Sequence, residues 1–180
     1  MIDYGLAPDA GLLILRLVVG LSLAAHGWAK FTGKGGIAGV GQWFESIGVR
    51  PGRGNAAVAA SIELTAGLGL AFGVLTPLPA AGVVAVMLVA SWTAHRHNGY
   101  FTSKGGWELD LIIAAGAVAV AATGAGRFSV DHLLFADLGI AQLLGGWWGL
   151  LIALGLGLAG GIGQLALFYR DPKKHPQQPA

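Results

Sequence analysis

The sequence predicts an all-α membrane protein, in which a four-helix transmembrane bundle is followed by an additional C-terminal transmembrane helix. Hydrophobic residues make up 54% of the chain and charged residues only 11%, whereas soluble domains carry about 25% charged residues. The apolar residues fall into runs of the length that crosses a hydrocarbon core of roughly 30 Å. The 31 glycines are typical of membrane helices that pack closely through small residues.

Five apolar runs are expected to span the membrane. They are residues 11–30, 55–75, 78–95, 107–123 and 143–169. The segment Thr76-Pro77-Leu78-Pro79 connects the second run to the third, and its two prolines predict a tight turn that makes these two helices an antiparallel hairpin.

The remaining segments are shorter or more polar. Residues 37–49 are too few to span a bilayer and are predicted to form an interfacial or partly re-entrant helix, with Trp43 and Phe44 at headgroup level. We expect residues 124–137 to be a loop. The chain is therefore predicted to have three parts. They are a four-helix membrane domain over 1–137, the extra fifth transmembrane helix within 138–169, and a polar, proline-rich tail at 170–180 that is predicted to be disordered and cytoplasmic.

The fifth run contains two G-x-x-x-G pairs, Gly145 with Gly149 and Gly157 with Gly161. Such pairs favour close packing on another helix, in this chain or in a partner, although a glycine-rich helix also matches the pattern by chance. Because this run lies outside the four-helix bundle, we expect it to dock on a partner protein or on a second copy, giving a homo-oligomer.

The basic residues predict the orientation. Nine of the 11 Lys and Arg residues fall in the segments that the five-span arrangement places on one side, Arg127 falls on the other, and Arg16 lies within the first span. By the positive-inside rule the N-terminus is outside and the C-terminus is cytoplasmic. The formal net charge of +2 gives no indication of a nucleic-acid partner. The expected surroundings are the lipid bilayer and other membrane or soluble proteins.

Charged side chains interrupt the first two runs. Arg16, His26 and Lys30 lie in the first run, and Glu63 is the single charged residue within the second. A charge at the bilayer centre costs roughly 2.5–3.5 kcal/mol on insertion scales, so such residues face a protein interior, pair with one another or reach the interface. We therefore expect Glu63 to face the bundle interior and to meet His26 or Lys30.

With this topology, His, Lys and carboxylate side chains converge on the cytoplasmic half of the bundle, and Arg16 stands nearer the outer side. A polar pocket there could bind a quinone headgroup, an anion or a proton in transit. Alternatively, Glu63 forms a structural pair that fixes helix register, and Lys30 extends to the headgroups. The candidate pocket residues are Arg16, His26, Lys30, Glu63, His95 and Glu108.

The cofactor alternatives are narrow. The chain has no cysteine, so a disulfide, a thiol relay or a cysteine-ligated cluster would have to belong to a partner. A haem between His26 and His95, or a metal held by these two with Glu63 and Glu108, would use suitable ligand types. No recognised ligand spacing accompanies them, so no metal site is predicted, and a quinone is the one cofactor that the pocket suggests.

Several motifs occur in order along the chain. The first run has Arg16-x3-Gly20 and then His26-Gly27-x2-Lys30, and the second has Glu63-x3-Gly67. The later motifs are Gly105-Gly106-x-Glu108 and Gly124-x-Gly126-x2-Ser129-x-Asp131. Over residues 11–131 this series resembles the DoxX family of small bacterial integral membrane proteins.

The resemblance implies a four-helix bundle in the bacterial inner membrane. Relatives are linked to membrane redox systems, namely a thiosulfate:quinone oxidoreductase subunit and a mycobacterial complex that joins a superoxide dismutase to a sulfurtransferase. The fifth span lies beyond the family pattern and suggests an added docking surface. The positions that recur in the family correspond here to Arg16, His26, Lys30, Glu63, Glu108 and Asp131.

Three functions are compatible with these observations. The favoured one is an accessory or anchoring membrane subunit of a redox or respiratory assembly, with a quinone-type pocket. The second is an enzyme subunit that itself passes electrons to quinone. The third is a small-molecule or proton transporter, for which inverted repeats and broken helices would be typical.

Overall fold

The computed structural model describes residues 6–172, and their regular structure is helical apart from one isolated bridge between Val49 and Tyr169. The long helices are α1 (Ala7–Thr32), α3 (Gly52–Phe72), α4 (Pro77–Ala90), α5 (Glu108–Thr123) and α7 (Gly146–Phe168). The shorter elements are α2 (Gly36–Ser46), the π-helical turn η1 (Ser91–His95), η2 (Arg96–Asn98), η3 (Thr102–Lys104), α6 (Val130–Phe135) and η4 (Gly139–Leu144). The predicted all-α membrane bundle is confirmed.

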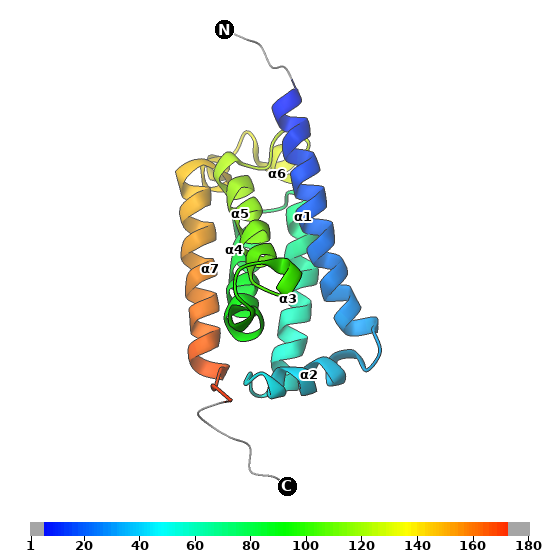
Figure 1. The fold of residues 1–180 in the computed structure, drawn as a ribbon. Helices are drawn as coiled ribbons and strands as arrows, with labels where there is room; N and C mark the ends of the chain where they lie inside the picture. The colour runs from blue at the N-terminus through cyan, green and yellow to red at the C-terminus, as the bar shows by residue number, and fades with distance from the viewer. Residues whose placement is uncertain (1–5, 173–180) are drawn as a thin grey trace.

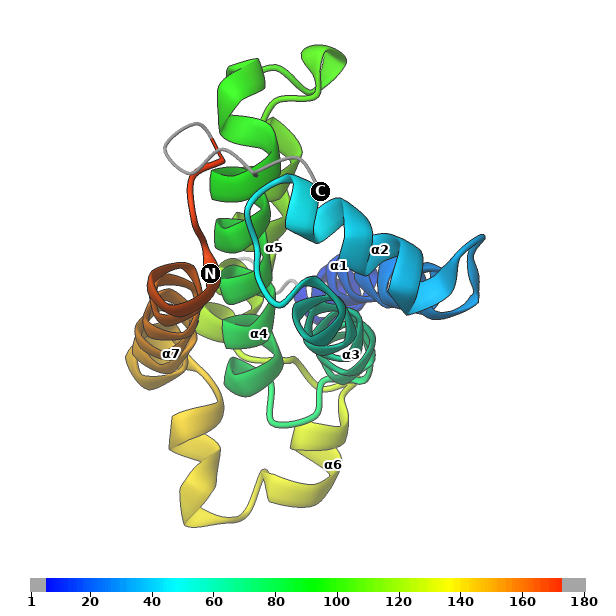
Figure 2. The same ribbon diagram turned by 90° about the horizontal axis from the view of Figure 1, so that it is seen from below.

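Consecutive long helices alternate in direction, so the first and last described helices begin and finish at opposite ends of the bundle (Figure 1). We name these the α6 end, which holds the α3–α4 turn, and the α2 end, which holds the η1–η3 segment. Viewed from the α2 end, α4 lies between α3 and α7 (Figure 2). The fully buried Leu70, Val83 and Val120 come from α3, α4 and α5 and form the centre of the core.

Four helices of the described chain are long and apolar enough to cross a membrane: α1, α3, α4 with its continuation to Asn98, and α7. The fourth expected span coincides with α5, but α5 has only 16 residues and is about 24 Å long. It packs against α4 and α7 along its length. The residues before α5 form the irregular η1–η3 segment and do not extend the helix, so α5 is short.

Small residues let α1 and α3 cross at close range. A Cβ atom placed on Gly20 would lie 2.5 Å from the carbonyl oxygen of Gly67, and one placed on Gly27 would lie 2.5 Å from the backbone nitrogen of Leu64. In a bilayer such close backbone contact replaces the hydrophobic driving force that water would supply. The α1–α3 contact is the most extensive in the bundle, and it brings the charged residues of the two helices together.

The glycines of α7 pack within the chain. A Cβ on Gly149 would lie 2.2 Å from the Ala121 oxygen of α5, one on Gly157 would lie 2.6 Å from Val84 Cβ of α4, and one on Gly161 would lie 2.8 Å from a Leu88 methyl. Close packing on another helix is confirmed. Because α4 and α5 of the same chain cover these glycines, they are not a free docking surface, and the expectation that the fifth span docks on a partner or a second copy stays a prediction.

The structure refines what was predicted for the shorter segments. The 124–137 region is not entirely loop, because it contains α6, whose first turn is capped by Ser129 Oγ accepting from the His132 amide at 3.1 Å. The tail prediction at 170–180 falls mainly on residues outside the described range. Its first residue is ordered, because the Arg170 amide donates to the Gly48 oxygen at 2.7 Å. The helix predicted at 37–49 is present as α2, with Phe44 buried and Trp43 exposed, and its position at the membrane interface stays a prediction.

Candidate functional site

A cavity of about 310 Å³ opens between the helices at the α2 end. Its walls come from α1, α2, α3, α4 with η1, α5 and α7, and most of the lining is aliphatic or aromatic. Two lining residues, Trp43 and Leu109, are each 48% exposed, so the cavity has a mouth on the outer surface of the bundle. The polar side chains that line it are His26, Lys30, Glu63, Thr93, His95, Asp110 and Gln164.

The first charged pair in this cavity joins α1 to α3. Lys30 Nζ donates to Glu63 Oε2, and the Glu63 side chain is 7% exposed against 21% for Lys30. Gly27 allows α1 to lie against α3 at this level, and Lys30 follows three residues later on the same face. The prediction that Glu63 faces the interior and meets α1 is confirmed, with Lys30 as the partner. His26 lines the same cavity but is exposed.

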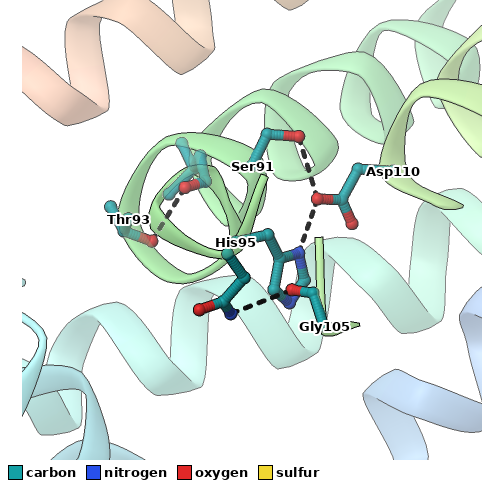
Figure 3. Close-up of polar contacts among 7 residues, drawn as sticks. Ser91, Thr93, His95, Gly105 and Asp110 are labelled. Atoms are coloured by element: carbon teal, nitrogen blue, oxygen red, sulfur yellow. Dashed lines mark hydrogen bonds and ion pairs between the residues drawn. The ribbon is translucent and has the colours of Figure 1, made fainter. Parts of the chain in front are cut away.

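The second polar pair in this cavity joins the end of α4 to the start of α5 (Figure 3). Asp110 is buried, and its Oδ2 lies 2.6 Å from His95 Nδ1 and accepts from Ser91 Oγ at 2.9 Å. Ser91 and His95 are the first and last residues of the π-helical turn η1. Helices adopt π geometry rarely, and often at functional sites. Here the turn presents both donors to one carboxylate oxygen.

The structure brings together His26, Lys30, Glu63 and His95 of the six candidates. Glu108 points elsewhere, because its Oε2 accepts from the Thr102 amide at 2.9 Å on the surface. Sequence reasoning missed Asp110 as a pocket residue, although it lies deeper in the fourth span than Glu108. It also missed Gln164, the single polar side chain within α7, which donates to Asn55 Oδ1 at 3.2 Å.

Arg16 lies at the opposite end of the bundle and is fully buried. Its Nη2 donates to the Phe128 oxygen at 2.5 Å, while Nε and Nη1 have no hydrogen-bond partner among the described residues. Nη1 lies against Gly73, where a Cβ atom would come within 2.0 Å of it. Gly73 also has a φ of +65°, so both the backbone and the arginine require glycine there.

Asp131 binds the turn between α3 and α4. Its Oδ1 accepts from the Leu75 amide at 2.6 Å, and its Oδ2 accepts from the amide and hydroxyl of Thr76 at 2.9 and 2.6 Å. Its own amide donates to the Gly73 oxygen at 2.8 Å. The carboxylate therefore replaces the hydrogen bonds that the helix end and turn lack.

A second cavity, of about 510 Å³, lies at the α6 end and is lined mainly by the 123–146 connection. Asp131 and Ser129 reach it, but Arg16 is not among its lining residues. Ligand sites are commonly apolar clefts with a few convergent polar groups, and this description fits the α2-end cavity better. Within residues 6–172 no three His, Asp or Glu side chains come close enough to hold a metal ion.

The end of α7 is bound to the segment that follows α2. Tyr169 pairs with Val49, and the Arg50 amide donates to the Phe168 oxygen at 2.8 Å. Arg96 links this strand-like pairing to η1: its guanidinium lies 4.2 Å from the Trp92 ring centroid and donates to the Tyr169 hydroxyl at 3.2 Å. Val49 and Gln164 both line the cavity, so the helix outside the family pattern contributes to its wall.

Comparison with known proteins identifies the family. The DoxX family model matches residues 11–96. The inner membrane protein YqjF of Escherichia coli is 31% identical over 126 residues, which cover 70% of this chain and 93% of the relative. A Bacillus subtilis protein named "Putative oxidoreductase CatD" is 30% identical over 128 residues, covering 71% and 89% respectively. No solved structure matches the chain. Together with the helical membrane bundle, these matches show that the chain belongs to the DoxX family.

Proposed function

We propose that the protein is an inner-membrane subunit of a redox assembly that binds the ring of a quinone in the α2-end cavity. The observation that carries this proposal is the cavity itself, in which an apolar lining surrounds two side-chain pairs, Lys30 with Glu63 and His95 with Asp110. An apolar ring with polar substituents at its edge matches that combination.

The size of the cavity supports a ring rather than a whole lipid. Its volume of about 310 Å³ lies at the lower limit of ligand pockets, which run from about 300 to 1,000 Å³. A long apolar tail would have to leave the protein. The half-exposed Trp43 and Leu109 border the cavity, so a tail that emerged there would enter the surrounding lipid.

The chain's own residues would bind and orient such a ring. The ammonium of Lys30 uses one of its three donors on Glu63 and has two left for a ligand oxygen. A quinone supplies two-electron and proton chemistry when bound. Because the chain has no cysteine, thiol or cysteine-ligated centres that exchange electrons with the quinone would belong to a partner. This makes an accessory role the favoured one.

The name of one relative refers to redox chemistry. The name of the Bacillus subtilis relative refers to an oxidoreductase, which is compatible with a redox assembly and also with the alternative that this chain is a quinone-reducing subunit. A transporter would need a path across the bundle. The described cavity lies at one end, which favours binding over passage.

Filling the cavity tests the proposal. Ala90 lines the cavity, whereas Ala115 is exposed on α5 and does not line it. The protein in lipid nanodiscs is titrated with duroquinone, with empty nanodiscs as the blank. We expect saturable binding that Ala90→Leu reduces at least about tenfold, because added methyl groups occupy the ring's space, and that Ala115→Leu leaves unchanged. Non-saturable partition into lipid that is equal for all three proteins would refute the proposal, and so would saturable binding that Ala90→Leu does not weaken.

A further inference from the structure

The hydrogen bonds of the π-helical turn fix which nitrogen of His95 carries a proton. Asp110 Oδ2 lies 2.6 Å from His95 Nδ1. An ionised carboxylate is acceptor-only, so the nitrogen that faces it must donate. Ser91 Oγ donates to the same oxygen and thus reinforces its role as the acceptor. In a neutral imidazole with a proton on Nδ1, the other nitrogen, Nε2, is an acceptor.

His95 Nε2 has no hydrogen-bond partner within the described chain, and the side chain is 37% exposed and lines the cavity. The Asp110 side chain, at 8% exposure, is buried behind it. Asp110 is therefore a positioning residue, and the acceptor Nε2 is the group that a ligand can reach. Asn98, Arg96 and His97 bond elsewhere and do not compete for it.

The other polar pair in the cavity contains both kinds of group. The free N–H donors of Lys30 favour a carbonyl oxygen, whereas the Glu63 carboxylate can only accept and favours a hydroxyl, so the preferences of this pair oppose one another. His95 Nε2 is an acceptor with no free donor beside it on the same ring. It accepts a hydrogen bond from a hydroxyl group. It cannot bond to a carbonyl oxygen, because both atoms carry lone pairs and repel each other.

We infer that His95 in its neutral form, through Nε2, makes the cavity selective for the reduced, hydroxyl-bearing form of its ring ligand over the oxidised dione form. The inference rests on the proposed function, since it specifies which form of a quinone-class ligand that same cavity prefers. It assigns to His95 the role of ligand acceptor and to Asp110, with Ser91, the role of fixing its tautomer.

The test compares two probes that differ only in redox state. Duroquinone and its hydroquinone are titrated anaerobically into the protein in nanodiscs. We expect the hydroquinone to bind about three- to tenfold more tightly, which is the value of one net hydrogen bond. His95→Phe should remove that ratio by weakening hydroquinone binding alone. His97→Phe is the matched control, because His97 is exposed and does not line the cavity, and its ratio should equal that of the wild type.

The Asp110→Asn variant tests whether Asp110 fixes the tautomer of His95 or only stabilises the fold. It should reduce the hydroquinone preference while leaving duroquinone affinity within about twofold, because the tautomer is no longer fixed. Equal affinity for both probes in the wild-type protein, or a ratio that survives His95→Phe, would overturn the inference while leaving quinone binding intact. Failure of both probes to bind would overturn the proposed function and the inference together. The wild-type ratio decides the matter even where a variant does not fold.

Discussion

At the α6 end the carboxylate of Asp131 gives both oxygens to the turn between α3 and α4, whereas at the α2 end Glu63 and Asp110 bind side chains that also line a cavity. Both ends bury acidic groups beside basic ones. The partners differ, because Asp131 is bound chiefly by backbone amides, and Glu63 and Asp110 are bound by Lys30 and His95. The backbone amides that bind Asp131 fix the turn between α3 and α4. The side chains that bind Glu63 and Asp110 keep further donors or acceptors that a ligand can use.

This difference explains why two similarly buried sets of residues have different roles. Arg16 and Asp131 tie segments far apart in sequence: the Phe128 oxygen is 112 residues from Arg16, and the Thr76 amide is 55 residues from Asp131. They act as connections that close the α6 end of the bundle. Lys30 and His95 each line the α2-end cavity and have polar atoms that the bonds to Glu63 and Asp110 do not use.

The largest expected effect is at Asp131. Asp131→Asn places an amide N–H₂ against the donors of Leu75 or Thr76, and it removes a negative charge near buried Arg16. The free energy of unfolding should fall by about 3–5 kcal/mol. Thr76→Val is the control, since it removes only the hydroxyl bond and should cost about 1 kcal/mol. Unfolding in mixed micelles by denaturing detergent measures both.

If the α6 end is structural, the Asp131→Asn protein that remains folded should bind duroquinone with wild-type affinity. A variant of normal stability that no longer binds would instead place a functional group at the α6 end, and the contrast between the two ends would be lost.

A smaller effect is expected from breaking the pair at the α2 end, and it should be asymmetric. Lys30→Met leaves Glu63 buried without its cation and should cost about 2–3 kcal/mol, less than Asp131→Asn because it removes one hydrogen-bond partner and places no donor against other donors. Glu63→Gln should cost only about 1 kcal/mol, because the partly exposed Lys30 can extend toward the interface. The double variant should be more stable than Lys30→Met alone, as unfolding in mixed micelles would show. Equal costs for the two single changes would contradict this account.

The smallest perturbation tests the placement of the two ends across the membrane. The predicted orientation puts the α6 end outside and the α2 end in the cytoplasm. Since the chain has no cysteine, single cysteines at Gly139, which has open space around it, and at exposed His97 can be labelled without altering stability. An impermeant thiol reagent added to intact cells should label Gly139→Cys and spare His97→Cys. The reverse pattern would show that the orientation is opposite to the predicted one. Labelling of both cysteines would contradict the arrangement in which five helices cross the membrane.

The sequence by itself determined the membrane class, the positions of the long helices and the inward direction of Glu63. These follow from local rules, because the length of an apolar run shows whether it can cross the bilayer and a lone charge within such a run needs a partner. The same rules predicted α2, because residues 37–49 are amphipathic and too few to span. They also placed His26, Lys30 and His95 at one end of the bundle, because the order and direction of the spans fix depth.

Only the tertiary structure decided which distant groups meet. The partner of Arg16 is a carbonyl of Phe128, and the glycine face of α7 is covered by α4 and α5 rather than by another protein. Asp110 rather than Glu108 enters the cavity because η1 is a π-helical turn that presents Ser91 and His95 to it. Sequence periodicity specifies the face on which a residue lies, but the helix that covers this face is chosen by the sum of packing contacts between remote segments.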